Sequence, residues 1–397
     1  MATKISVSNA FKIFGDNPGA AVELLKSGAS KNDIQEKTGQ IVGVQNTSFE
    51  VKEGEIFVVM GLSGSGKSTL VRMINGLIPA TDGKIMIEGS DIASCSRQQL
   101  RDIRRRKVAM VFQHFALLPH KTVADNVAFG LKIKGMGAAE RRKKAEEALA
   151  QVGLESWADS YPDELSGGMQ QRVGLARGIA TEAEILLMDE PFSALDPLIR
   201  RDMQEELLEL QRSLKKTIVF ITHDLNEALI LGDHIAIMKD GRFVQVGSAE
   251  EIVGQPADDY VAAFTADIDR SRVFTAGSVA APAEAIDLRS GGARDAIERM
   301  QALGRDALYV TDGERIAGAV TYRDLTAAAR EDDGAALKEA LISDYPAASR
   351  TTQLFELYPL AQSGLPIALV SRRGRLEGVV SPEAVFAKLA GSEEEAA

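Results

Sequence analysis

A glycine-rich stretch, Gly61-Leu-Ser-Gly-Ser-Gly-Lys-Ser-Thr69, constrains the fold of this chain more than any other feature. It matches the pattern G-x-x-x-x-G-K-[ST], follows the apolar run Ile56–Met60 and precedes the apolar stretch Leu70–Leu77. Glycines let the backbone wrap around a phosphate group, and the first N–H groups of the following helix attract negative charge. The sequence therefore predicts a strand, a phosphate-binding loop and a helix, within an α/β fold.

The residues of this loop have distinct expected roles in binding ATP with Mg²⁺. The Lys67 ammonium can reach the β- and γ-phosphates, and the Ser68 hydroxyl is a typical Mg²⁺ ligand. A glycine turn that merely precedes a helix is the alternative, which the flanking strand and helix patterns disfavour. The residues expected to contact the nucleotide are Gly61, Leu62, Ser63, Gly64, Ser65, Gly66, Lys67, Ser68 and Thr69.

Two adjacent acids, Asp189 and Glu190, follow the apolar run Ile185–Met188. A carboxylate at the end of a buried strand needs a cation or water as its partner. We therefore expect Asp189 to hold Mg²⁺ and Glu190 to polarise the water that attacks the phosphate. Two solvated acids at a strand end are the alternative.

The length of the chain, 397 residues, predicts more than one domain. Apolar runs at 185–188 and 217–222, with helical patterns between them, predict parallel strands covered on both faces. We place a first domain at 1–265, with an inserted helical segment of unassigned function at 18–39. A stretch rich in Ala, Ser, Gly and Pro then indicates a linker at 266–277.

The C-terminal region, 278–392, contains an internal repeat, because 307–325 and 367–385 each read as strand, turn, strand and helix. The two repeats are expected to cover about 278–335 and 336–392. Two copies of such a small unit predict a pseudo-symmetric pair that shares one core.

Composition excludes several classes of protein. No stretch of about 18 uncharged apolar residues could cross a bilayer, and the N-terminus lacks the apolar core of a signal peptide. The single cysteine, Cys95, cannot form an internal disulfide, so we expect a cytoplasmic location. A net charge of −11 argues against nucleic acid as a partner.

A second phosphate-directed helix end is predicted at Leu165-Ser-Gly-Gly-Met169, where Ser166 can cap a helix over 169–180. A simple helix cap is the alternative. With the loop at 61–69, this motif resembles the ABC ATPase family, from Val7 to about Phe264. The resemblance implies a phosphate-loop ATPase fold with a helical signature subdomain at about 115–180. In that family the signature motif caps the γ-phosphate held by the opposite subunit of a head-to-tail dimer, and Met169 here replaces its usual glutamine.

The remaining elements of the ABC family occur in order, and their roles follow from the resemblance. Gln113 matches the glutamine that touches Mg²⁺ and the attacking water, and His223 matches the histidine that contacts the γ-phosphate. Phe14 is the candidate for stacking on adenine, with Phe11 as the fallback and core packing as the alternative for either. The resemblance implies Lys67, Gln113, Glu190 and His223 as catalytic, Ser68, Gln113 and Asp189 as Mg²⁺ ligands, and Ser166, Gly167, Gly168 and Asp196 as further nucleotide-site residues.

Short segments of the sequence, such as MGLSGSGKST at 60–69 and VFQHFALLPH at 111–120, resemble the importers of quaternary amines. That resemblance implies an ATPase subunit at the cytoplasmic face of the inner membrane, with permease subunits and an extracytoplasmic binding protein for glycine betaine, proline betaine or choline. An amino-acid or methionine importer is the runner-up. A soluble ABC ATPase and a nucleotide-sensing module are two further candidates.

The C-terminal repeat resembles a pair of CBS (cystathionine-β-synthase-type) regulatory domains. Thr321–Asp324 matches that family's ribose-contacting pattern, whereas Ser381–Ala384 lacks the aspartate. The resemblance implies input from an adenine nucleotide or from ionic strength, and a purely structural repeat is the alternative. Three arginines, Arg372, Arg373 and Arg375, could meet anionic lipid, although a solvated turn also explains them.

Overall fold

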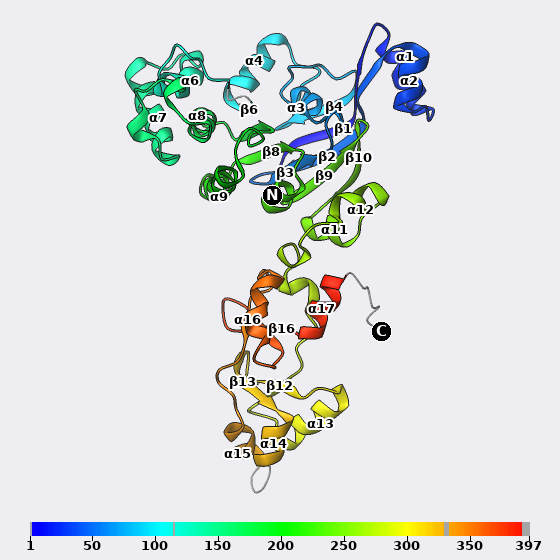
Figure 1. The fold of residues 1–397 in the computed structure, drawn as a ribbon, viewed down its shortest axis with the longest axis vertical. Coiled ribbons are helices and arrows are strands. Elements are labelled where there is room, and N and C mark those ends of the chain that lie inside the picture. The colour runs from blue at the N-terminus through cyan, green and yellow to red at the C-terminus, as the bar shows by residue number, and fades with distance from the viewer. Residues whose placement is uncertain (1, 114–115, 329–332, 391–397) are drawn as a thin grey trace. The chain divides into compact units, whose positions relative to one another are not determined.

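The computed structural model describes residues 2–113, 116–328 and 333–390, and it divides into two compact units, Met1–Ala266 and Asp267–Ala397 (Figure 1). The predicted α/β fold class is confirmed by the central sheet of the first unit, whose strand order is β10-β9-β3-β8-β7-β6. All of its pairings are parallel except that of β10 with β9. Its strands are β3 (Ile56–Met60), β6 (Val108–Phe112), β7 (Ile185–Asp189), β8 (Thr217–Thr222), β9 (His234–Lys239) and β10 (Arg242–Gly247).

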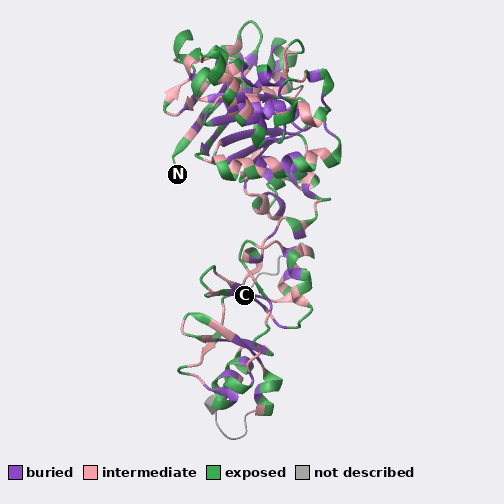
Figure 2. Ribbon diagram, turned by 90° about the vertical axis from the view of Figure 1, so that its left-hand side faces the viewer, coloured by how far each residue is buried: buried purple, intermediate pink, exposed green. Residues whose placement is uncertain are grey.

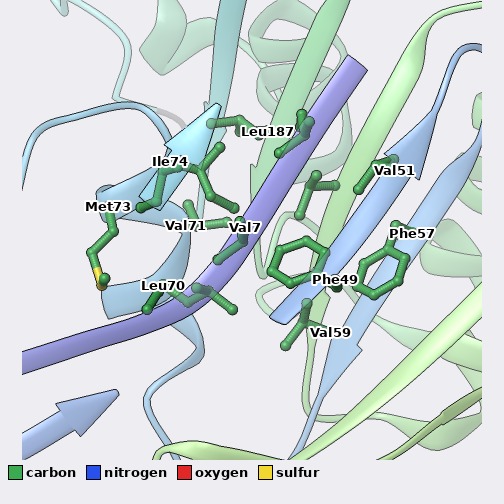
Figure 3. Close-up of a cluster of buried hydrophobic side chains, with 14 of the residues drawn as sticks. Val7, Phe49, Val51, Phe57, Val59, Leu70, Val71, Met73, Ile74 and Leu187 are labelled. Carbon is green, nitrogen blue, oxygen red and sulfur yellow. The ribbon is translucent and has the colours of Figure 1, made fainter. Parts of the chain in front are cut away.

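A second, antiparallel sheet, in the order β2-β1-β4-β5, faces the central one. Its strands are β1 (Thr3–Phe14), β2 (Ile41–Lys52), β4 (Asp82–Ile87) and β5 (Ser90–Asp91), and helix α3 (Lys67–Ile74) lies between the sheets. Figure 3 shows the core that results, in which Val7 and Phe49 meet Leu70 and Val71. The strands are mostly buried in Figure 2, since apolar side chains cover both faces of the central sheet. This core fixes the loop that joins β3 to α3.

Helices occupy the two segments that interrupt these sheets. Between β6 and β7 lie α5 (Val123–Val127), α6 (Phe129–Ile133), α7 (Ala138–Gln151) and α8 (Gly167–Ala180), which group together beside the sheet in Figure 1. The insertion after Phe14 forms α1 (Pro18–Lys26) and α2 (Lys31–Thr38), which pack through Ala21, Val22 and Ile34 onto β1 and β2. The remaining helices of this unit are α4 (Arg97–Arg106), α9 (Pro197–Leu214), α10 (Leu225–Leu231), α11 (Ala249–Gly254) and α12 (Asp259–Thr265).

The second unit contains two three-stranded sheets of the same design, β11-β12-β13 and β14-β15-β16. In each sheet, the first strand runs parallel to the middle strand, and the third strand runs antiparallel to it. The strands are β11 (Ala285–Asp287), β12 (Ala307–Asp312), β13 (Arg315–Thr321), β14 (Ala347–Ala348), β15 (Ile367–Val370) and β16 (Leu376–Val380). The helices are α13 (Ala293–Leu303), α14 (Tyr322–Ala328), α15 (Asp333–Glu339), α16 (Tyr358–Ala361) and α17 (Pro382–Ala390).

Each half of the second unit donates a short segment to the sheet of the other half. Ala281 exchanges two backbone hydrogen bonds with Val379, at 2.9 and 3.0 Å, and Ile342 does the same with Ala319, at 3.0 and 2.8 Å. A further bridge joins Arg315 to Arg375, which occupy equivalent positions in the two repeats. The halves also share a core around Tyr309. The expected end of the second repeat, 391–392, lies outside the described residues.

The segment at 266–277, for which the sequence predicts a linker, is folded into the second unit. It contains the 3₁₀ turns Arg270–Arg272 and Ala276–Val279, and only 1% of Phe274 is exposed. The cationic side chains of Arg270 and Lys388 lie over its ring. No helix within the described ranges is long and apolar enough to cross a membrane.

Candidate nucleotide site

The glycine-rich loop is held between two neighbouring backbone segments. Gly61 and Gly66 have φ angles of +154° and +108°, which disfavour other residues. A Cβ atom at Gly61 would lie 2.2 Å from the Met238 carbonyl oxygen, and one at Gly66 would lie 2.2 Å from that of Gly43. The Gly241 N–H also donates to the Ser65 carbonyl, at 2.9 Å. The two glycines are therefore required by the packing of the loop as well as by its curvature.

Lys67 is fixed within this loop. Its Nζ donates to the carbonyl oxygens of Gly61 and Leu62, at 2.8 and 3.1 Å, and lies 3.7 Å from Glu190 Oε1. Burial lowers the pKa of Lys67, while the Glu190 carboxylate opposes that shift. Nearby, the buried Ser65 Oγ has no hydrogen-bond partner among the residues that the structure describes. A glycine cradle with a buried ammonium and an unpaired hydroxyl fits the phosphates of a nucleotide.

Ser68 and Asp189 come together from two different elements. Ser68 lies in the first turn of α3, Asp189 ends β7, and the Ser68 hydroxyl donates to Asp189 Oδ1 at 2.8 Å. Arg72 Nη2 lies 3.9 Å from the other carboxylate oxygen of Asp189. A hydroxyl beside a carboxylate supplies the hard oxygen donors that Mg²⁺ prefers, so this pair fits the expected metal position.

Glu190 and His223, which follow the neighbouring strands β7 and β8, also meet. His223 Nδ1 lies 2.9 Å from Glu190 Oε2. Glu190 has a φ of +47°, an uncommon conformation for a side chain of this size, and its N–H donates to the Ile221 carbonyl at 3.1 Å. This turn places the Glu190 carboxylate at the carboxyl end of the sheet, beside Lys67.

Gln113 reaches this group through Ser193. Its Nε2 donates to Ser193 Oγ at 3.2 Å, and Ser193 Oγ donates to the Glu190 carbonyl at 3.0 Å. Asp196, three residues further on, caps α9 by accepting the N–H groups of Leu198 and Ile199, at 3.2 and 3.1 Å. Gln113 therefore contacts the turn that carries Glu190 through Ser193, whereas the contacts of Asp196 are at the start of α9.

The two candidates for adenine stacking have different environments. Phe11 is buried in the core beneath the insertion, with 4% of it exposed, whereas Phe14 is 39% exposed. Gly43 lies between the Phe14 ring and helix α3. A Cβ atom at Gly43 would lie 2.8 Å from Phe14 Cε2 and 3.3 Å from Thr69 Cγ2. The Phe14 ring thus lies beside the phosphate loop, and its contact with adenine stays a prediction.

The signature residues stand apart from the phosphate loop of their own chain. Ser166 caps α8 by accepting the Met169 N–H at 3.4 Å, and both Ser166 and Gly167 are exposed. Among the described residues, no hydrogen bond or ion pair joins residues 166–168 to residues 61–69. Contacts thus join the phosphate loop with Asp189, Glu190, His223 and Gln113 in one cluster. Residues 167 and 168 lie instead beside Leu195 and Ile199, which flank Asp196.

Comparisons with known proteins agree with this geometry. Residues 44–193 match the family model described as ABC transporter. The chain is 48% identical to the glycine betaine/carnitine transport ATP-binding protein GbuA of Listeria monocytogenes, over 98% of each chain. It is 50% identical to the glycine betaine/proline betaine transport system ATP-binding protein ProV of Escherichia coli, over 96% of each. The chain belongs to the ATP-binding subunits of quaternary-amine ABC importers.

The fold of these ATPase subunits is also found in solved structures. A dimeric post-hydrolysis ATP-binding cassette bound to ADP and Pi matches with a TM-score of 0.52 and 34% identity, over 62% of this chain and 98% of that one. The matched part of the subunit thus has the fold of a solved ATP-binding cassette.

Several contacts of the nucleotide site could not be predicted from the sequence patterns described above. Gly43 separates Phe14 from the loop helix, Gly241 supports the loop, and Arg72 faces Asp189. The dipeptide Asp240-Gly241 is a turn signal that could have identified the support, because it follows an apolar run typical of a strand. Nothing local indicated Gly43 or Arg72.

Gly168 provides a test of the signature region in the ATPase subunit. A methyl group added by Gly168→Ala would lie 2.5 Å from Ile199 Cγ2, so either the Ile199 side chain or the contact between α8 and α9 must shift. We expect the free energy of unfolding to fall by about 1–3 kcal/mol in denaturant titrations, as for other overpacked sites. Gly167→Ala is the matched control, because its methyl group would meet Leu195 at 4.0 Å and should change stability little. Equal stabilities for both variants would contradict the packing argument, and Gly168→Ala with Ile199→Ala should recover the loss.

Proposed function

We propose that this chain hydrolyses ATP to energise the import of a quaternary amine, such as glycine betaine, proline betaine or choline. The observation that carries the proposal is the extent of the similarity to GbuA, which covers 98% of both proteins and includes the second unit. A likeness confined to the cassette would indicate only an ABC ATPase.

The proposed active form is a head-to-tail dimer with two shared sites. One copy supplies Lys67, Ser68 and Asp189, and the other supplies Ser166 and Gly168. The exposure of Ser166, and its separation from the phosphate loop of its own chain, support an arrangement in which a second copy completes each site. A single copy alone is expected to hydrolyse ATP poorly.

The chemistry proposed for each site relies on positioning and on electrostatic stabilisation. Lys67 binds the β- and γ-phosphates, and Glu190 orients a water for attack while accepting its proton. His223, 2.9 Å from Glu190, contacts the γ-phosphate and fixes the carboxylate. Ser68, Asp189 and Gln113 would hold Mg²⁺, which would neutralise charge that develops on the phosphate oxygens.

A groove beside Gln113 is the proposed contact with the permease. Its volume is about 490 Å³, and its lining includes Phe112, Phe129 and Ile133 together with Arg101 and Arg105. All three apolar side chains are more than a third exposed. We propose that a short permease helix with acidic residues binds there, because an apolar floor with a cationic rim is complementary to it. Such a contact would hold the subunit at the cytoplasmic face of the membrane.

The second unit is proposed to be a pair of CBS-type domains that regulates transport. Its two equivalent three-stranded sheets and their shared core support that assignment. A nucleotide, anionic lipid or ionic strength is the proposed input, and an extracytoplasmic protein is proposed to deliver the amine.

Transport measurements test the proposed function. The chain is reconstituted in proteoliposomes with the permease and binding protein of its own system, and uptake of radiolabelled compounds is measured with ATP inside. We expect ATP-dependent uptake of at least one quaternary amine and none of methionine. Uptake of methionine without uptake of any quaternary amine would contradict the proposal and favour the amino-acid importers.

A further inference from the structure

The first turn of α9 contains an arginine, Arg200, whose guanidinium contacts two loops of the nucleotide site. Arg200 Nη2 donates to the Leu195 carbonyl at 3.0 Å. Arg200 Nη1 donates to Asp224 Oδ2 at 3.3 Å. Leu195 belongs to the loop at 193–196, and Asp224 directly follows His223. The planar guanidinium group therefore binds both loops at once and holds them in a fixed position relative to each other.

A buried acid, Glu227, lies behind the same guanidinium. Its side chain is 5% exposed, and Arg200 Nε lies 3.7 Å from Glu227 Oε1. Thr222 donates to Glu227 Oε2 at 2.6 Å, and Gln204 Nε2 donates to Oε1 at 3.3 Å. Burial raises the pKa of Glu227, while the charge of Arg200 opposes that shift. The carboxylate thus anchors both the strand end that precedes His223 and the arginine.

Each of the two loops contacts a residue that is proposed to take part in ATP hydrolysis, namely Glu190 or His223. Ser193 donates to the Glu190 carbonyl at 3.0 Å, so the loop at 193–196 contacts the Glu190 backbone. On the other side, Thr222 Oγ1 accepts the Asp224 N–H at 2.9 Å, which shapes the turn that presents His223. The loop at 193–196 therefore supports Glu190, and the turn at Asp224 supports His223. Together they hold the contact between the two residues.

We infer that Arg200 is a positioning residue for ATP hydrolysis, which holds the loop beside Glu190 and the loop of His223 in one geometry. The inference rests on the proposed roles of Glu190 and His223. Arg200 acts through the two loops and not through contact with the nucleotide. Small errors in the position of catalytic groups slow a reaction more than they weaken substrate binding.

The first experiment compares Arg200→Met with Arg201→Met in the transporter reconstituted with its own permease. Arg201 is the matched control, because it is the next residue of α9 and its side chain is 73% exposed and pairs only with Glu205 among its described ion pairs. We expect Arg200→Met to lower kcat about 10- to 100-fold, with the KM for ATP changed less than about twofold. Arg201→Met should behave as wild type, and Arg200→Lys should recover only part of kcat, since an ammonium cannot keep the planar set of contacts.

A second variant separates positioning from a merely structural role. Arg200→Met leaves the Glu227 charge buried without its cation, which could destabilise the fold. Adding Glu227→Gln removes that charge and retains a side chain that can bond to Thr222 and Gln204. We expect the double variant to regain the wild-type melting temperature while its kcat stays low.

Recovery of both the melting temperature and kcat in the double variant would overturn the inference. So would a wild-type kcat for Arg200→Met alone. If wild type itself showed no ATP hydrolysis, the proposed function would fail instead, which distinguishes the two outcomes.

Discussion

Replacing Glu190 with glutamine is expected to lower ATP hydrolysis at least about 100-fold while ATP still binds. The amide keeps the size of the side chain and its place beside Lys67 and His223, but it cannot accept a proton from the attacking water. Steady-state phosphate release by the reconstituted transporter measures the loss. Binding of a fluorescent ATP analogue shows whether the variant still binds ATP. Because both copies are proposed to contact each ATP, ATP that is not hydrolysed should hold them together, so the variant should also accumulate as a dimer in size-exclusion chromatography with ATP.

Glu209→Gln, at an exposed position of α9, is the control for this substitution and should hydrolyse ATP at the wild-type rate. Turnover of Glu190→Gln within a few fold of wild type would show that another group activates the water. In that case the contact between His223 and Glu190 would have a structural purpose only.

The second large effect is expected from Lys67→Met, which should weaken ATP binding about 100-fold or more. Lys67 is only 4% exposed, and its ammonium is the cation of the phosphate loop. A hydrogen bond to a charged group contributes about 1.5–3 kcal/mol, so the loss of contacts to two phosphates corresponds to at least about 3 kcal/mol. Isothermal titration with ATP measures the change directly.

Lys84→Met, at an exposed position of β4, removes the same charge away from the site and should leave the affinity unchanged. An affinity of Lys67→Met within about threefold of wild type would contradict the assignment of the phosphate loop. A loss of fold would be recognised separately by circular dichroism.

Local sequence patterns predicted those parts of the site that depend on neighbouring residues. The run Ile56–Met60 forms β3 as expected, whereas the helix expected over the apolar stretch Leu70–Leu77 begins and ends three residues earlier, at Lys67–Ile74. Asp189 and Glu190 were placed correctly at a strand end because parallel strands present their carboxyl ends at one edge. The strand expected at 217–222 has those bounds in the structure, and the one expected at 185–188 extends by one residue to Asp189.

Contacts between distant segments could not be predicted in this way. Gly43 meets Phe14 only because the insertion at 18–39 folds away and returns the chain to β1. Arg200 looks in sequence like any charged residue of an amphipathic helix, and its partners lie in loops that only the fold brings together. The segment at 266–277 has the composition of a linker, but the aromatic ring of Phe274 is buried within the second unit.

The exchanged segments of the second unit make its two repeats inseparable. Ala281 completes the sheet that contains Val379, and Ile342 completes the sheet that contains Ala319. Neither repeat could fold by itself without leaving an edge of its sheet unpaired. We therefore expect the two repeats to melt together in one cooperative step, so that a change which loosens one half also loosens the other.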